Sequence, residues 1–260
     1  EDTSNGIVGK LTIGGSAVIQ SAGEQAVQNW GEATIEAGSI TGEVFSWSYK
    51  GVNSTLDIKG GNIDGDVAGI DFEANKESTA SVSISGGTVT GRVVEGNYSD
   101  GKVVSVEPDE TYAKMEISGG AYQNDVSKFV AEGSSELVKA SGGSRYQVGQ
   151  YTSSTQGVTA AAQLNGKSVY FEALNDAVTH AGVTGVTVTA NATLTEEIPE
   201  DVNVTVLDGA TLTAQGDLTG VTFSDGAKLV VPEGQTATVG GKEYASGSYE
   251  AQQDGTLSKP

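Results

Sequence analysis

The chain has no cysteine and a single histidine, which excludes disulfide frameworks, thiolate zinc sites, cysteine nucleophiles and multi-histidine metal centres. Basic residues are scarce: 14 Lys and Arg stand against 34 Asp and Glu in 260 residues, and the formal net charge is −20. Such a chain repels a nucleic-acid backbone or an anionic membrane surface. No apolar run approaches the roughly 18 residues that span a bilayer. We therefore expect neither nucleic-acid binding nor membrane insertion.

Glycine is abundant, with 37 residues, and much of it belongs to a repeated motif. The motif reads apolar, polar, Ile, any residue, two small residues, any residue, then a β-branched or aromatic residue. Its five copies are spaced by 22, 23, 26 and 33 residues, measured between their isoleucines. These isoleucines are Ile13, Ile35, Ile58, Ile84 and Ile117.

Each copy predicts two short strands joined by a sharp bend. Alternation of period two places the isoleucine and the residue two positions before it on one face of a strand. The small pair, Gly86-Gly87 for example, lets the chain bend without a Cβ clash. A third apolar stretch closes each of the first four units, at 26–30, 44–49, 67–72 and 93–98. Three short strands per repeat leave no room for a helical crossover, so the pattern predicts a parallel β-helix with an interior column of isoleucines.

The 33-residue interval before Ile117 holds polar turn-forming sequence at 99–102 and 107–110. We expect this interval to leave the β-helix as a loop or an extra hairpin. Residues 123–133 predict one or two helical turns, begun by Asp125 and ended by Gly133, that cover the open end. We therefore place a five-coil β-helix with its cap over residues 1–140, and a linker poor in apolar residues over 141–163.

A second, smaller β-rich module is expected over residues 164–260. Residues 169–181 have an apolar face at helical spacing and predict a short helix that caps this module. Short β-branched segments separated by Gly, Asp and Asn turns follow about every ten residues. Turn spacing fits either another β-helix or a sandwich, and the helix-first order favours the β-helix.

Several segments resemble one family of proteins. The Ile-Ser-Gly-Gly runs at 84–87 and 117–120, the longer string 117–133, and the segment 164–178 leading into 186–188 carry the resemblance. They are similar to repeats of large secreted or wall-associated proteins of gut-dwelling Gram-positive bacteria, whose modules are pectate-lyase-like right-handed β-helices. The resemblance implies a right-handed coil, an extracellular or cell-surface location, an adhesin-like or glycan-contacting role, and neighbouring domains in a longer surface protein.

Enzymatic pectate-lyase relatives use calcium held by clustered carboxylates, with an arginine or lysine as base. Asp64, Asp66 and Asp71 lie in one repeat and faintly resemble a glycine-aspartate calcium loop, but the neighbouring repeats lack it. The two arginines are Arg92 and Arg145, and the second falls in the expected linker. We therefore expect a solvated acidic turn, no metal or cofactor, and no catalytic residue.

Aromatic residues recur in the third apolar stretch of successive repeats, and two interpretations are open. They are Trp30, Trp47, Tyr49, Phe72 and Tyr98. Exposed rings in a column would stack on sugar faces, whereas rings that alternate in step with aliphatic residues usually belong to the core. Parity favours an interior stack. If the rings form a platform instead, Trp30, Trp47 and Tyr98 are the candidates for sugar contact.

These observations predict a non-enzymatic extracellular or cell-surface module. It would serve as a rigid stalk or as an adhesin-like module that contacts host or dietary glycans along the β-helix, with repetition supplying avidity. The alternative is a polysaccharide lyase or hydrolase acting in the lateral groove of the β-helix. Carboxylates and a basic group converging in that groove would favour the alternative.

Overall fold

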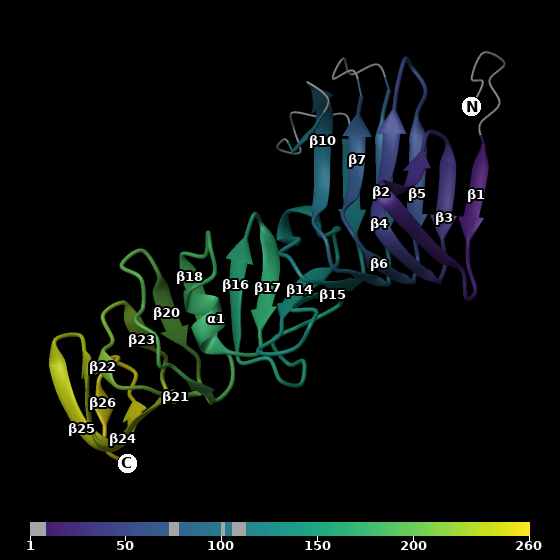
Figure 1. The fold of residues 1–260 in the computed structure, drawn as a ribbon. Helices are drawn as coiled ribbons and strands as arrows, with labels where there is room; N and C mark the ends of the chain where they lie inside the picture. The colour runs from purple at the N-terminus through teal and green to yellow at the C-terminus, as the bar shows by residue number, and fades with distance from the viewer. Residues whose placement is uncertain (1–8, 73–77, 100–101, 106–112) are drawn as a thin grey trace. The chain divides into compact units, whose positions relative to one another are not determined.

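One parallel sheet, whose strands run side by side in Figure 1, carries the five motif isoleucines. Its strands, in spatial order, are β1 (Lys10–Ile13), β3 (Glu32–Ile35), β5 (Ser54–Ile58), β8 (Ala80–Ile84) and β12 (Ala113–Ile117). Each isoleucine is the register partner of the next, from Ile13 through to Ile117. All five side chains are at most 5% exposed. The predicted isoleucine column is confirmed.

The computed structural model describes residues 9–72, 78–99, 102–105 and 113–260. The chain divides into two compact units. Unit 1 comprises residues 1–134 and 143–149, and unit 2 comprises residues 135–142 and 150–260. In both units the regular secondary structure is mainly β-strand, so the expected all-β class is confirmed. No helix in the described ranges has the length and apolar character that crossing a membrane requires.

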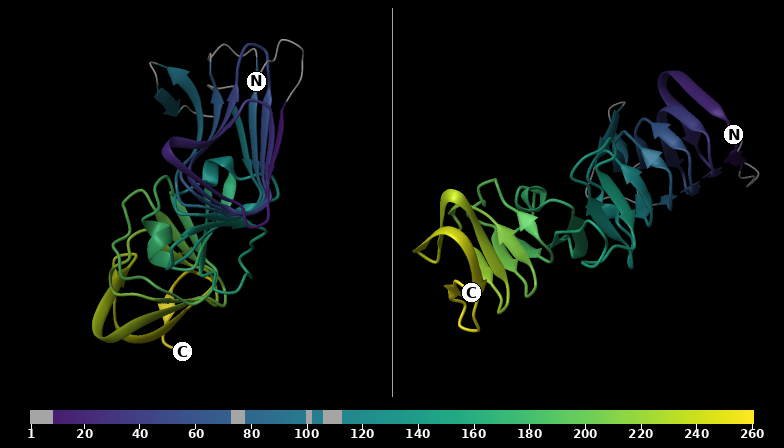
Figure 2. Two further views of the ribbon diagram at one scale, coloured as in Figure 1. Left: turned by 45° about the vertical axis from the view of Figure 1, so that its right-hand side comes forward. Right: turned by 90° about the horizontal axis from the view of Figure 1, so that it is seen from below.

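A second sheet of unit 1 faces the isoleucine sheet. It contains β2 (Val18–Asn29), β4 (Ser39–Ser48), β6 (Asn62–Asp64), β7 (Val67–Asp71), β9 (Thr88–Val89), β10 (Val93–Ser99), β11 (Lys102–Ser105), β13 (Gly120–Tyr122) and β15 (Tyr146–Gly149). Its parallel pairs again join residues one repeat apart, which gives two further interior columns. One column is Ile19, Ile40, Ile63, Val89 and Tyr122, and the other is Val27, Val44, Val67 and Val93. Figure 2 shows the strands of successive repeats following one another along unit 1.

The small pair in each motif is required by the close stacking of successive bends. A Cβ built on Gly86 would lie 2.5 Å from the carbonyl oxygen of Lys59 in the preceding repeat. The next residue, Gly87, has a φ of +89°, which L side chains rarely adopt. At bends that carry two glycines, a side chain at either position would therefore disturb the pairing of successive repeats.

The far edge of the isoleucine sheet is covered as expected. A 3-10 turn, η3 (Ser127–Phe129), follows Asp125, whose carboxylate accepts a hydrogen bond from the Ser127 N–H at 2.8 Å. Val130 then bridges Ile117 in parallel, so β12 is not left open along this part. The insertion before Ile117 begins as the predicted hairpin, with β11 antiparallel to β10. Residues 106–112 of the insertion lie outside the described residues.

The expected linker over 141–163 differs from what is observed. Residues 146–149 form β15, which pairs antiparallel with β13 and places Tyr146 opposite Tyr122. Val148, 4% exposed, packs into the core of unit 1. The low apolar content of the stretch suggested a spacer, but the alternation of Tyr146 and Val148 is sufficient for a short strand within a sheet.

Unit 2 contains two groups of strands. One has β14 (Ser135–Val138), β16 (Ala160–Leu164), β17 (Lys167–Phe171), β18 (Gly185–Val188), β20 (Asn203–Val206) and β23 (Val221–Phe223). The other has β19 (Ala192–Thr193), β21 (Thr211–Thr213), β22 (Gly216–Asp217), β24 (Lys228–Val239), β25 (Lys242–Ala251) and β26 (Leu257–Ser258). β18, β20 and β23 pair in parallel and stack Val186 on Val204 and Val221.

The helix expected over 169–181 is shorter and starts later. The observed α1 spans Leu174–Val178 and buries Leu174, Ala177 and Val178. Val169 and Phe171 are fully buried but belong to β17, an antiparallel partner of β16. A helical reading of the apolar spacing was wrong here because residues 167–171 alternate with period two and end in β-branched and aromatic residues, which favour a strand.

Candidate functional site

The aromatic residues of the third apolar stretch gather on the outer face of the sheet formed by β2, β4, β7 and β10. Along β4, Val44 packs in the main core, and the Ser46 hydroxyl lies 2.8 Å from that of Ser54 in the facing sheet. Phe45 and Trp47 alternate with Val44 and Ser46 along the strand and therefore point away from the interior. They belong to a separate apolar cluster with Ala68, Ile70 and Val94.

The expected aromatic stack does form a core cluster, with Phe45 and Trp47 buried, but the cluster lies on the outer face of the sheet and not in the interior that holds the isoleucine column. The rings do share a face with aliphatic residues, as predicted. That face is the outer one because the inner positions of these strands carry a polar network. Asn29 donates a hydrogen bond from Nδ2 to Ser46 Oγ at 2.9 Å and to the Thr55 carbonyl at 2.7 Å. On β10, Glu95 is 4% exposed and accepts a hydrogen bond from the Met115 N–H.

We call the outer aromatic group the aromatic face; it consists of Trp30, Phe45, Trp47, Tyr49, Phe72 and Tyr98. Trp47 lies at its centre. Its ring stacks on Trp30, with centroids 5.5 Å apart and planes 13° apart, and meets Tyr98 edge to face at 5.4 Å. Phe72 stacks on Tyr98 at 4.9 Å and meets Tyr49 edge to face at 5.2 Å. These are favourable geometries for aromatic pairs, so the face is held together by its own rings.

The three nominated residues come together, but they differ in exposure. Trp47 is 4% exposed, and its indole Nε1 has no hydrogen-bond partner among the described residues. It supports the face rather than offering a surface. Trp30 and Tyr98 are half-buried and present part of their rings to solvent. Trp30 follows the edge strand β2, so one side of its ring faces Trp47 and no described strand lies beyond the other.

Tyr49 and Phe72 are also half-buried members of the aromatic face, although sequence reasoning did not nominate them for sugar contact. The sequence does contain a signal for them, because Tyr49 lies two positions after Trp47 and Phe72 two positions after Ile70, which places each pair on one face of a strand. Lys50 lies over the Tyr49 ring, with Nζ 4.8 Å from the centroid, and brings a positive charge to this end of the face.

The acidic turn does not gather into a metal site. Asp66 accepts hydrogen bonds from the Nε of Arg92 at 3.0 Å and from the backbone N–H of Arg92 at 2.8 Å. The Asp66 carboxylate also forms an ion pair with the Arg92 guanidinium at 2.6 Å. Asp64 accepts a hydrogen bond from Thr90, whereas Asp71 is buried and has the inward parity of Val67. The hydrogen bond to Asp66 and its charge raise the pKa of Arg92. Arg92 therefore stays protonated and is poorly suited to act as a base.

Comparisons of the chain with protein-family models, curated proteins and solved structures find no match. The candidate site is therefore described by its geometry alone.

Proposed function

We propose that unit 1 is a right-handed parallel β-helix of a secreted or cell-surface protein, and that it serves as an adhesin-like module contacting glycans through the aromatic face. The observation that carries the proposal is the arrangement of the rings: Trp30, Tyr49, Phe72 and Tyr98 present part of their surface around the buried Trp47. A pure stalk gives no reason for several partly exposed rings to gather on one face of the described residues.

The β-helix assignment is supported by the strand register. Among the described residues of unit 1, each parallel pair of strands joins residues one repeat apart, and the chain visits the two facing sheets in the same order in successive repeats. Connections between parallel strands are right-handed in about 98% of known cases, which favours the proposed hand.

The chemistry of the aromatic face fits a neutral sugar. One face of a pyranose ring carries mostly C–H groups, which are attracted to the electron-rich face of an aromatic ring. With a net charge of −20, the chain repels polyanionic glycans such as uronates or sulfated polymers. Neutral polysaccharides of host or dietary origin are therefore the favoured partners. A lyase needs a basic group, and Arg92 is paired with Asp66 and poorly suited to act as one. This pairing favours a binding role over lyase chemistry.

Retention on immobilised neutral polysaccharides tests the proposal. Wild-type protein is expected to be retained, and Trp30→Ala to lose most of that retention without unfolding, because Trp30 lies on an edge and is half-buried. Leu207→Ala, at an exposed apolar position of unit 2, is the matched control and should be retained like the wild type. Equal retention of Trp30→Ala would overturn glycan contact through the aromatic face, and release of unsaturated uronides would favour the lyase alternative.

A further inference from the structure

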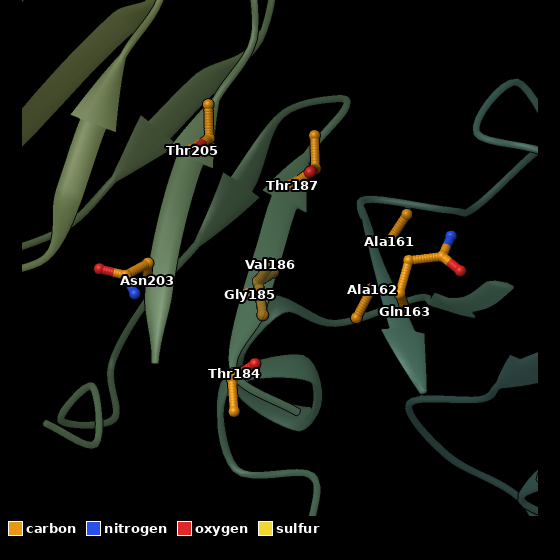
Figure 3. Close-up of a pocket in the computed structure, with 9 residues that line it drawn as sticks. All are labelled: Ala161, Ala162, Gln163, Thr184, Gly185, Val186, Thr187, Asn203 and Thr205. Atoms are coloured by element: carbon orange, nitrogen blue, oxygen red, sulfur yellow. The ribbon is translucent and has the colours of Figure 1, made fainter. Parts of the chain in front are cut away.

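We propose that unit 2 carries a binding site for a neutral sugar on the outer face of β16, β18 and β20, whether or not the aromatic face of unit 1 binds glycans. A pocket of about 380 Å³ lies on this face (Figure 3). Ala161 and Gly185 give it a low floor, and the amide side chains of Gln163 and Asn203 rise from β16 and β20. Pockets for small ligands range from about 300 to 1,000 Å³, so this one suits a mono- or disaccharide.

Strand register sets the shape of the site. Ala161 is the partner of Thr187, and Thr187 is the partner of Thr205. On the other side of β16, Ala161 is paired with Tyr170 of β17. Cross-strand partners point to the same face of a sheet, and neighbouring strands lie about 4.8 Å apart. The half-buried Tyr170 ring therefore stands one strand away from the alanine floor and offers an aromatic flank.

The polar groups of the pocket are available to a ligand. The side chains of Thr184, Thr187 and Asn203 make no hydrogen bond to another described residue. Gln163 donates from Nε2 to Ser168 and keeps its carbonyl oxygen for a further donor. Within the pocket, the Thr205 hydroxyl lies 3.3 Å from that of Thr222 and so already has a partner. The side chains left to a ligand are therefore those of Thr184, Thr187 and Asn203 and the carbonyl oxygen of Gln163.

The lining selects the class of ligand. None of the described residues around the pocket is charged, in a chain whose net charge is −20. An ionic ligand would find no counter-charge, and a purely apolar ligand would leave hydroxyl and amide groups unpaired. A neutral polyhydroxylated molecule satisfies both conditions, because its hydroxyls donate and accept, and its C–H face can lie on Ala161 and against Tyr170. This chemistry belongs to a neutral sugar.

The test uses the full chain and saturation-transfer NMR with lactose, cellobiose, maltose and chitobiose, and with a galacturonate disaccharide as the charged comparator. At least one neutral disaccharide should bind, and the galacturonate should not. Asn203→Ala should weaken binding about 5- to 10-fold through loss of one hydrogen bond. Ala161→Leu, which fills the floor, should abolish it. Thr211→Ala, on β21 of the other strand group, is the control and should bind like the wild type.

The outcomes separate this site from the aromatic face. Binding that survives Trp30→Ala and is lost in Ala161→Leu supports the unit 2 site. Binding lost in Trp30→Ala but unchanged in Ala161→Leu belongs to unit 1 and overturns the present proposal, as does the absence of binding by every neutral disaccharide. If Ala161→Leu fails to fold, the methyl resonance of Thr187 replaces it as the readout. That resonance should shift on addition of sugar, and an unshifted resonance overturns the site.

Discussion

The hydroxyls of Ser46 and Ser54 lie 2.8 Å apart across the interior of unit 1, and Asn29 bonds to Ser46 from the neighbouring strand. This buried polar contact joins the two facing sheets at the level where the other face of β4 carries Phe45 and Trp47. At this level the interior of unit 1 is polar, although the rest of its interior is apolar, and the large apolar side chains of β4 lie on the outer face.

Asn29→Ala is expected to lower the free energy of unfolding by about 1–3 kcal/mol, because the Ser46 hydroxyl and the Thr55 carbonyl lose a buried donor. Urea unfolding measures the change. Gln28→Ala, at the exposed position one residue before, is the control and should change stability little. Equal effects of the two variants would mean that the Asn29 network does not stabilise the interior.

Trp47→Ala should destabilise the protein by about 3–5 kcal/mol, since it removes a buried ring from the centre of the aromatic face. Trp30→Ala should cost clearly less, because Trp30 is half-buried on an edge. Thermal or urea unfolding of the two variants compares them directly. The reverse order of stability would contradict the supporting role assigned to Trp47.

Gly86→Ala is expected to destabilise unit 1 by about 1–3 kcal/mol, because the new Cβ would lie 2.5 Å from the Lys59 carbonyl oxygen. Gly143→Ala is the matched control, as a Cβ at that position meets nothing within 4 Å. Chemical denaturation measures both. A neutral Gly86→Ala would show that successive bends are not stacked as closely as described.

Tyr122 should make stability sensitive to alkaline pH. Burial raises the pKa of its phenol, whose hydroxyl donates to the Gly119 carbonyl at 2.7 Å. The folded chain therefore holds this proton at a pH where the unfolded chain releases it, so the contribution is full below pH about 10 and declines above it. Urea unfolding from about pH 8 to 11 measures the decline. Tyr122→Phe should lose about 1 kcal/mol near neutrality and show a shallower alkaline decline; identical pH profiles would contradict this account.

Periodicity alone predicted the isoleucine column and its register, because a strict pattern of apolar, polar, Ile leaves one way to stack the repeats. It also predicted that Trp47 shares a face with Phe45 and Tyr49. Which face is interior could not be read from the pattern, because the decisive contacts of Asn29 with Ser46 and Thr55 join residues from different repeats. Hydrophobicity alone would place the aromatic rings inside and the serines outside. Here the hydrogen bonds of Asn29 with Ser46 and Thr55 satisfy the polar groups inside, and the rings lie on the outer face.

The pocket of unit 2 left no signal in the sequence. Ala161, Thr187 and Thr205 are ordinary residues on separate strands, and only the register of β16, β18 and β20 brings them together. The short helix was misplaced for a related reason: residues 169–171 fit a helical stripe in sequence, but pairing with β16 satisfies their backbone as a strand.

Tryptophan fluorescence tests the glycan-binding claim most directly, because the two tryptophans of the chain, Trp30 and Trp47, both belong to the aromatic face. Titration of the wild type with neutral oligosaccharides should give a saturable change in emission, and Trp47→Phe should retain it through Trp30. An emission that stays constant across neutral oligosaccharides, at concentrations where the protein is retained on the matching polysaccharide, would contradict contact through this face.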